Sequence, residues 1–458
     1  MAAHLRIGIL IFFSVANSFN VFSSSKNITS FGCIPNSGKD LTKQFQKAID
    51  FVYENKIDSL IIPSGMYSLN SIDIPPGIAI IGKNRPTLIK IANAGKWSRM
   101  FNTQTGKYAY DQAEDSRPLI IANIQFNGNY QNQGTYLGYE LQQQHLVMIC
   151  AKPTSKGRFV AKISDCSFSN SVADGISIFT NADVTVSKCV AENVFRGGIV
   201  LGGGNSRLRV DHFRGKGKIH PSGFHVEVDG SGYNGMTDIE VHINHMILED
   251  GHFDIIMYEG TTIANDVLCK KPLININTNG KGEVKIKKST FYCGNNQNSL
   301  IYFPKKVTFD DCTFYCNESA TGSCCFYILN SAYYLRGSDQ QVYFNRCIFE
   351  SKISKNNSTA IIIAADKKEL NNSTSLYACK FINFETGIDM RQGGNVNIDF
   401  SEFKCSNSLN IGYSEKYLYQ LSLKRSIFNN KFANKMMLAE HKGNIVNFDK
   451  NYMKLQKK

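Results

Sequence analysis

The sequence predicts a right-handed parallel β-helix, an all-β solenoid in which every coil adds one strand to each sheet. Short segments between residues 171 and 259 open near a glycine and then alternate apolar with other residues, which is typical of strands with one buried face. A six-residue motif also recurs over most of the chain, with copies about 22 to 25 residues apart where no loop is inserted. Parallel strands joined over such short intervals wind with a right hand almost without exception.

The strand-like segments come in four copies, and their outward residues differ. The copies span residues 174–178, 197–201, 222–229 and 252–258. In the first two copies the residues between the apolar ones are small or apolar. In the last two copies they are polar and ionisable: His225, Glu227, Asp229, Asp254 and Tyr258. We therefore expect the functional surface on the outward face of these last two copies.

The six-residue motif has a cysteine at its fourth position in five copies, and we expect that position to point into the core. Such a column of small side chains is better explained as buried packing than as metal or redox chemistry. Cys293 and Cys316 share a different register on neighbouring coils, at a spacing that a disulfide can just bridge. The total of 13 cysteines is odd, so at least one thiol has no partner within the chain. The five motif cysteines are Cys166, Cys189, Cys312, Cys347 and Cys379.

The chain begins in the manner of an exported protein. Arg6 precedes an apolar run at residues 7–15 and small residues follow, so residues 1–25 are expected to be a secretory signal peptide and the protein to be secreted or periplasmic. No later stretch has the length of a membrane span. We expect residues 26–458 to form one β-helix domain, with a cap and first coil at 26–82 and stacked coils at 118–450.

The formal net charge of +13 suggests an anionic partner such as an acidic polysaccharide. Nucleic acid is excluded as the expected partner because the sequence has no helix-turn-helix, zinc-finger or ribonucleoprotein motif and begins with an export signal. We expect a monomer, with a trimer as the alternative.

The segment from residue 31 to residue 82 carries a family resemblance. Its motifs at residues 31–42, 45–50, 60–67 and 80–82 together resemble the opening of the pectate lyase superfamily, which includes polygalacturonases and rhamnogalacturonases. The resemblance implies a parallel β-helix that acts on a polysaccharide. Phe45, Ile49 and Val52 also give this segment a helical apolar stripe, with Thr42 as its expected N-cap. Such a helix would cover the open end of the solenoid.

The resemblance stops short of the usual polygalacturonase residues. Only Asp174 matches an aspartate of the family's first catalytic motif, and Gly197 and Gly198 stand where the family has two successive aspartates. The family's glycine-histidine-glycine and arginine-isoleucine-lysine motifs are not evident. Asp174 is therefore either a site residue or a hydrogen-bonding residue of the turn before Gly175.

Alignment of the buried positions of the four copies predicts which outward residues are neighbours. It places Ser177, Val200, His225 and Asp254 in one ladder across the coils and Glu227 beside Ile256 in the next, with Asp229 beside Tyr258. We predict that Glu227, Asp254 and His225 are catalytic. Arg196, Tyr258, Asp229 and Asp174 are expected to bind substrate, with Arg196 as the clamp for a substrate carboxylate.

Three functions are compatible with this cluster. The first is a glycoside hydrolase on an acidic polysaccharide, with Glu227 and Asp254 as the paired carboxyl groups and His225 in support. The second is a polysaccharide lyase, in which Arg196 or a bound Ca²⁺ neutralises a uronate and His225 or Tyr258 removes the adjacent proton. The third is a β-helix that binds sugar without catalysis, such as an adhesin. Apart from Ca²⁺ in a lyase, we expect no cofactor and no metal ligands in the cluster.

Overall fold

The protein is described here from a computed structural model. The described residues are 24–103, 107–108, 117–134, 143–152, 157–217, 222–228, 238–270, 274–278, 281–293, 299–302, 304–317, 324–330, 340–352, 358–365, 372–392, 394–411, 419–429, 445–448 and 454–456. The predicted signal peptide and Asp229 lie outside these residues, apart from the last two residues of the peptide.

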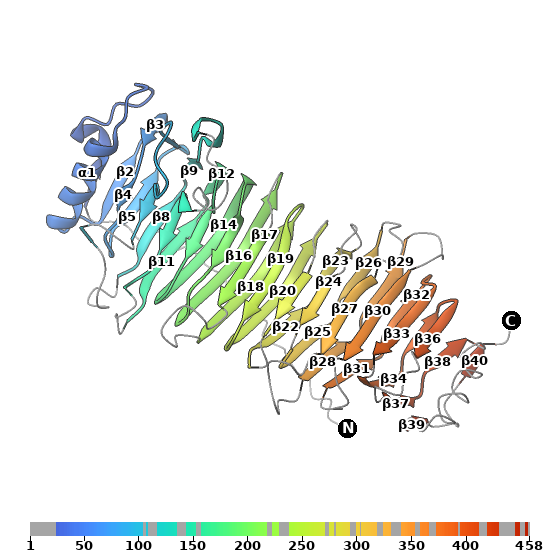
Figure 1. Ribbon diagram of the computed structural model, residues 1–458. Helices are drawn as coiled ribbons and strands as arrows, with labels where there is room; N and C mark the ends of the chain where they lie inside the picture. Colours follow the sequence, from blue (N-terminus) through green and yellow to red (C-terminus); the bar gives the residue numbers. More distant parts are fainter. Residues whose placement is uncertain are drawn as a thin grey trace, which may run out of the picture.

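The chain is a right-handed parallel β-helix, as the sequence predicts, and its coils stack from the N-terminal to the C-terminal end (Figure 1). Within the described residues all strand pairs are parallel and form two long sheets. Sheet B contains β4 (Ile72–Asp73), β7 (Phe101–Asn102), β10 (Val147–Ile149), β13 (Ile176–Ile178), β15 (Gly197–Leu201), β17 (Ser222–Val228), β19 (His252–Met257), β21 (Ile274–Asn277), β24 (Ser299–Tyr302), β27 (Cys324–Asn330), β30 (Thr359–Ala365), β33 (Thr386–Gln392) and β36 (Asn407–Ile411).

Sheet A is the larger sheet, and the chain crosses it between successive strands of sheet B. Its strands are β1 (Ser25–Asn27), β2 (Ser59–Ile62), β3 (Met66–Leu69), β5 (Ala79–Gly82), β6 (Thr87–Lys90), β8 (Leu119–Ala122), β9 (Gln125–Asn127), β11 (Phe159–Ser164), β12 (Ser167–Ser171), β14 (Ala182–Val194), β16 (Ser206–Lys216), β18 (Ile239–Leu248), β20 (Thr261–Cys269), β22 (Glu283–Lys287), β23 (Thr290–Cys293), β25 (Lys306–Asp310), β26 (Thr313–Cys316), β28 (Gln340–Asn345), β29 (Ile348–Ser351), β31 (Asn372–Tyr377), β32 (Lys380–Ile382), β34 (Gly394–Asp399), β35 (Glu402–Lys404), β37 (Tyr419–Lys424), β38 (Ile427–Asn429), β39 (Ile445–Phe448) and β40 (Lys454–Gln456). Two short 3₁₀ helices, η1 (Ile28–Phe31) and η2 (Tyr130–Asn132), lie outside the sheets.

The helix α1 (Thr42–Glu54) lies at the N-terminal end of the solenoid (Figure 1). It buries Phe45, Ala48, Ile49 and Val52, which confirms the predicted apolar stripe. The prediction that Thr42 is the N-cap is wrong, because Thr42 is the first helical residue and Leu41 precedes it. Asp40 takes the capping role instead, since its Oδ1 accepts a hydrogen bond of 2.9 Å from the backbone N–H of Thr42.

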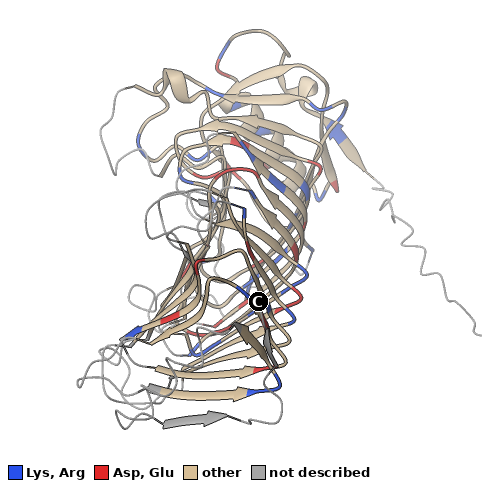
Figure 2. Ribbon diagram, turned by 90° about the vertical axis from the view of Figure 1, so that its right-hand side faces the viewer, with Lys and Arg blue, Asp and Glu red and all other residues tan. Residues whose placement is uncertain are grey.

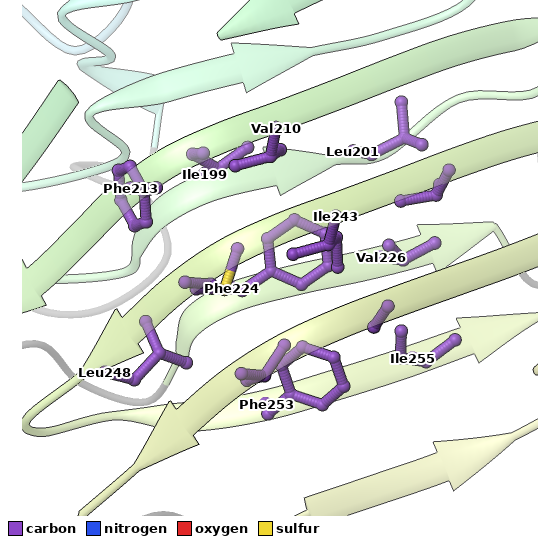
Figure 3. Close-up of a cluster of buried hydrophobic side chains, with 14 of the residues drawn as sticks. Ile199, Leu201, Val210, Phe213, Phe224, Val226, Ile243, Leu248, Phe253 and Ile255 are labelled. Atoms are coloured by element: carbon purple, nitrogen blue, oxygen red, sulfur yellow. The ribbon is translucent and has the colours of Figure 1, made fainter. Parts of the chain in front are cut away.

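The core is filled from both sheets by the inward residues of each coil. Phe213 and Ile243 come from sheet A, and Ile199, Phe224 and Phe253 come from sheet B (Figure 3). All five side chains are buried. The alternation read from the sequence therefore has the right phase, because a slip of one residue would turn these side chains outward.

The six-residue motif forms a corner within sheet A. Its third residue has a positive φ, for example 53° at Asp165, 51° at Lys188 and 54° at Arg346. This left-handed conformation bends the strand and directs the next residue into the core. Because the next residue is the motif cysteine, the corner explains why all five of these thiols are buried: Cys166, Cys189, Cys312, Cys347 and Cys379.

The buried cysteines are free thiols. A contact with Cys166 together with burial holds the pKa of Cys189 well above its usual value, and burial does the same for Cys347. Cys293 and Cys316 are register partners on β23 and β26, as expected, but no disulfide joins them.

Thiol labelling provides a test of this arrangement. The five motif cysteines are expected to resist a thiol reagent in the native protein and to react after denaturation, because the reactive form is the exposed thiolate. Labelling followed by mass spectrometry of the cysteine peptides measures this directly. Rapid reaction of most of the five in the native protein would contradict the corner geometry.

The charged residues on sheet A are paired across neighbouring strands. Arg207 lies 3.0 Å from Glu240, Arg209 lies 2.7 Å from Asp183, and Lys216 lies 2.9 Å from Glu192, where each distance joins a side-chain nitrogen to a carboxylate oxygen. Figure 2 shows Lys and Arg mixed with Asp and Glu along the solenoid. The positive net charge is therefore distributed rather than gathered on sheet A. No helix in the described part of the chain is long and apolar enough to cross a membrane.

Candidate functional site

The outward ladder predicted from the sequence is present on sheet B. Ser177 pairs with Val200, Val200 with His225, and His225 with Asp254. Glu227 pairs with Ile256 in the next ladder, as expected. Strands β17 and β19 therefore bring together the three residues that were predicted to be catalytic.

His225 lies between two carboxylates. Its Nδ1 is 3.3 Å from Oδ2 of Asp254, and its Nε2 is 3.2 Å from Oε2 of Glu227. The exposed fractions of the side chains are 50% for Glu227, 16% for His225 and 6% for Asp254. Glu227 is thus the carboxylate that faces solvent. Asp254 is almost fully buried and contacts the other ring nitrogen of His225.

This arrangement sets the protonation state of the imidazole. Burial lowers the pKa of His225, but the hydrogen bonds and negative charges of Asp254 and Glu227 outweigh it and raise the pKa to about 9. His225 is therefore an imidazolium at neutral pH, with both ring N–H groups directed at carboxylates. In that form it can donate a proton, and it is a poor acceptor.

The raised pKa makes stability depend on pH. The pKa of His225 in the folded protein is above its unfolded value, so its stabilising contribution is fully present below about pH 6.5 and is lost as the pH rises through about 9. The shift corresponds to a contribution of the order of 3 kcal/mol. Denaturant titrations of wild type and His225→Gln from pH 6 to pH 10 should show the stability difference shrinking over this window. A difference that stays constant across the window would rule out the imidazolium.

Further polar groups extend this cluster along sheet B in both directions. A guanidinium nitrogen of Arg196 lies 3.7 Å from Oε2 of Glu227, and Nε of Arg196 lies 3.8 Å from Oδ1 of Asp174. On the other side, Nδ1 of His252 lies 3.8 Å from Oδ2 of Asp254. We call the resulting line of groups the polar row. It consists of His145, Asp174, Arg196, Glu227, His225, Asp254 and His252.

The first two members of the polar row are completely buried. Nδ1 of His145 lies 3.0 Å from Oδ2 of Asp174, and neither side chain has any exposed surface. Burial lowers the pKa of His145, against the pull of Asp174, and Arg196 lowers it further. In this structure Asp174 is closed off from solvent, and its Oδ1 lies beside Nε of Arg196. Its expected role in substrate binding stays a prediction.

Two members of the polar row, His145 and His252, were not among the predicted site residues. His252 lies two residues before Asp254 on one strand, and that spacing alone puts both on the same face. His145 precedes β10, and the backbone N–H of Leu146 donates to the carbonyl of Asp174 at 3.0 Å. The strand copies aligned from the sequence begin at residue 174, so the coil that carries His145 was not among them.

Other expected residues lie elsewhere. The ring of Tyr258 is covered by Nζ of Lys281, 4.9 Å from its centroid, and no described contact joins Tyr258 to the polar row. Asp229 falls outside the described residues. Four basic residues close to these strands in sequence, Arg207, Arg209, His242 and His245, are on sheet A and pair with acids there.

Packing explains why glycines stand at the positions where the resemblance leads one to expect two aspartates. A Cβ atom on Gly198 would lie 2.6 Å from the carbonyl oxygen of Gly223 and 3.0 Å from the ring of Phe213. No side chain fits at position 198. The acidic groups of this surface are instead carried by the next two coils, on Glu227 and Asp254.

Comparisons with known proteins identify the fold. No family model and no curated protein matches the chain. Among solved structures, the A-module of a mannuronan C-5 epimerase from Azotobacter vinelandii is similar with a TM-score of 0.58 and 10% identity, over 82% of this chain and 98% of that one.

Two other solved structures are similar at lower scores. Tailspike protein 3 of bacteriophage CBA120 has a TM-score of 0.47 and 10% identity, over 85% of this chain and 59% of that one. The catalytic domain of a GH87 α-1,3-glucanase has a TM-score of 0.44 and 11% identity, over 84% of this chain and 66% of that one. At identities this low the likeness concerns the fold, and function has to be argued from the site.

Proposed function

We propose that this protein is an exported enzyme that cleaves an anionic, uronate-containing polysaccharide by glycoside hydrolysis. The observation that carries the proposal is the position of His225 between Asp254 and a solvent-facing Glu227, two carboxylates that raise the pKa of its imidazole to about 9. An exposed carboxylate beside a proton donor is what hydrolysis of a glycosidic bond requires, since one group activates the attack and the other protonates the leaving oxygen.

Each of the three residues has a separate role in this mechanism. Glu227 lies beside Arg196 and His225 and is the proposed nucleophile or the base that activates water. His225 delivers its Nε2 proton, which is on the side of the solvent-exposed Glu227, to the leaving sugar oxygen. Asp254, which is almost fully buried, holds the imidazole in place and stabilises its charged form. This mechanism differs from the sequence-based hypothesis in which Glu227 and Asp254 are the two reacting carboxyl groups, because Asp254 acts here through His225.

Arg196 is proposed to bind a carboxylate of the polymer. Its side chain is 24% exposed, and it lies beside the reactive Glu227. Arg196→Ala is expected to raise KM about 10- to 100-fold for a uronate polymer, because a hydrogen bond to a charged group contributes roughly 1.5–3 kcal/mol. KM for a neutral polymer should change little. Arg196→Lys keeps the charge and serves as the control. Equal increases in KM for charged and neutral polymers would contradict the proposal that Arg196 binds a carboxylate of the polymer.

A lyase is the second candidate, and one observation favours it. Arg196 and the imidazolium of His225 both flank Glu227, which is the arrangement needed if Arg196 neutralises a uronate while Glu227 removes the adjacent proton. His225 does not serve as the base here, because it is already protonated at neutral pH.

Product analysis tests both candidates. The purified protein is incubated with a panel of uronate-containing and neutral polysaccharides, and new reducing ends and ultraviolet absorbance are recorded. Hydrolysis releases reducing ends without an unsaturated sugar, whereas a lyase leaves an unsaturated sugar that absorbs in the ultraviolet. Binding to a polymer without release of any fragment would support the third option, a sugar-binding β-helix.

A further inference from the structure

A second cluster of ionisable side chains lies on sheet A, away from the polar row. It is built where β16, β18 and β20 turn their corners on three consecutive coils. His212, His245 and Asp266 occupy the corner position and each has a φ of 55°. Asp211 precedes His212 and is register partner to Asn244. The repeat of the corner therefore aligns two imidazoles and two carboxylates.

The two imidazoles face one carboxylate. Nδ1 of His212 lies 2.9 Å from Oδ2 of Asp211, and Nδ1 of His245 lies 3.8 Å from Oδ1 of the same residue. The two rings are parallel, with centroids 4.6 Å apart and an interplanar angle of 7°. One potential ligand atom from each of the three residues lies within 4.8 Å of the other two.

The groups that contact His245 and Asp211 from outside the cluster resemble the hydrogen-bond partners of known metal ligands. Nε2 of His245, the ring nitrogen remote from Asp211, lies 3.4 Å from Oδ2 of Asp266. The side-chain amide of Asn244 donates to Oδ1 of Asp211 at 3.0 Å, and that of Asn265 donates to Oδ1 of Asn244 at 3.0 Å. Ligating histidines commonly donate their second N–H to a carboxylate, and ligating carboxylates are themselves hydrogen-bonded.

We propose that Asp211, His212 and His245 bind a divalent transition-metal ion, with Zn²⁺ as the best fit. Two imidazoles and a carboxylate are a donor set that Zn²⁺ accepts, whereas Ca²⁺ and Mg²⁺ favour oxygen ligands alone. Tetrahedral Zn²⁺ with bonds of about 2.0–2.1 Å brings its ligand atoms to about 3.4 Å from one another. Since the three side chains are 45–55% exposed, rotation about their side-chain bonds can close that gap.

An open groove of about 470 Å³ lies beside the two imidazoles. It is bordered by His212, His245 and Asp266, by apolar side chains such as Met246 and Leu268, and by the basic residues Lys188 and Arg214. Three protein ligands and an accessible fourth position are the pattern of zinc sites that bind water or a small ligand, unlike closed structural sites with four protein ligands.

Titration with Zn²⁺ tests the proposal. Isothermal calorimetry on the full protein, produced without a histidine tag, is expected to show one ion bound per chain. His212→Asn and His245→Asn remove one imidazole each while keeping a residue that tolerates a positive φ. Each is expected to weaken Zn²⁺ binding by at least about 10- to 100-fold, the loss that even removal of an outer partner causes.

His242→Asn is the matched control, because His242 lies on the same strand as His245, is 43% exposed and pairs with Glu240 at 2.8 Å. The affinity of the His242→Asn variant for Zn²⁺ should equal that of wild type. The proposal is overturned if wild type binds no Zn²⁺ at millimolar concentration, or if the control loses as much affinity as His245→Asn. Cu²⁺ binding to the wild type is a second test that needs no variant. The electron paramagnetic resonance spectrum of bound Cu²⁺ should show two imidazole nitrogens as ligands. A spectrum with oxygen ligands alone would refute the site.

Discussion

Replacing Glu227 with glutamine is expected to lower kcat about 10²- to 10⁴-fold on any polymer that the wild type cleaves, the contribution of a positioned general acid or base. The fold should be retained, but the free energy of unfolding should fall by part of the roughly 3 kcal/mol that the raised pKa of His225 contributes, because Glu227 is one of its two carboxylate partners. The inward residues of β17, Phe224 and Val226, are untouched.

Asp254→Asn should lower the rate by a comparable factor for a different reason. It removes the charge that helps to keep His225 protonated, so the alkaline limb of the pH–rate profile should also move to lower pH. Glu240→Gln on sheet A is the matched control for Glu227→Gln, because the side chain of Glu240 is 42% exposed against 50% for Glu227 and contacts His242 and Arg207 instead. Full activity in both site variants would show that the chemistry takes place outside this cluster.

Phe349→Ala is expected to cost about 3–5 kcal/mol of unfolding free energy, the usual range for removing a buried phenylalanine. Phe349 is fully buried and stacks on Phe314 and Phe381, with ring centroids 5.0 Å and 4.8 Å away. These rings belong to a column at the sixth position of the repeated motif. The column contains Phe291, Phe314, Phe349, Phe381, Phe403 and Phe428.

The control for this loss is Phe400→Ala. Phe400 is 48% exposed at a corner, so its removal should cost less than about 1 kcal/mol. Urea denaturation followed by circular dichroism measures both variants. Equal losses of unfolding free energy in Phe349→Ala and Phe400→Ala would mean that a ring in the buried column contributes no more stability than an exposed ring.

The repeated pattern made the fold and the register predictable. Because side chains alternate strictly along a strand, the buried positions Ile199, Phe224 and Phe253 fixed the phase, and the contact between His225 and Asp254 followed from it. Spacing also predicted which cysteines are buried. These features depend only on neighbouring coils, for which the sequence interval is short.

The remaining features depend on where the coil turns. Arg209 and His245 are close in sequence to the polar row, but a corner or turn between them and sheet B places them on another face. His145 contacts Asp174 from the preceding coil, but the strand copies aligned from the sequence begin at residue 174, so that coil was not included. The bridging of Glu227 and Asp254 by His225 depends on side-chain rotation, which periodicity does not encode.

The polar row also has a length and a direction. Its members come from five consecutive coils, those of β10, β13, β15, β17 and β19, so at roughly 4.8 Å per coil it extends about 19 Å along the solenoid axis. An extended polymer lying parallel to the axis meets the exposed members of the row on the three coils of β15, β17 and β19, whereas one lying across the strands meets a single coil. Gain or loss of one coil would therefore lengthen or shorten the polar row by about one coil rise, while leaving the chemistry of every other coil unchanged.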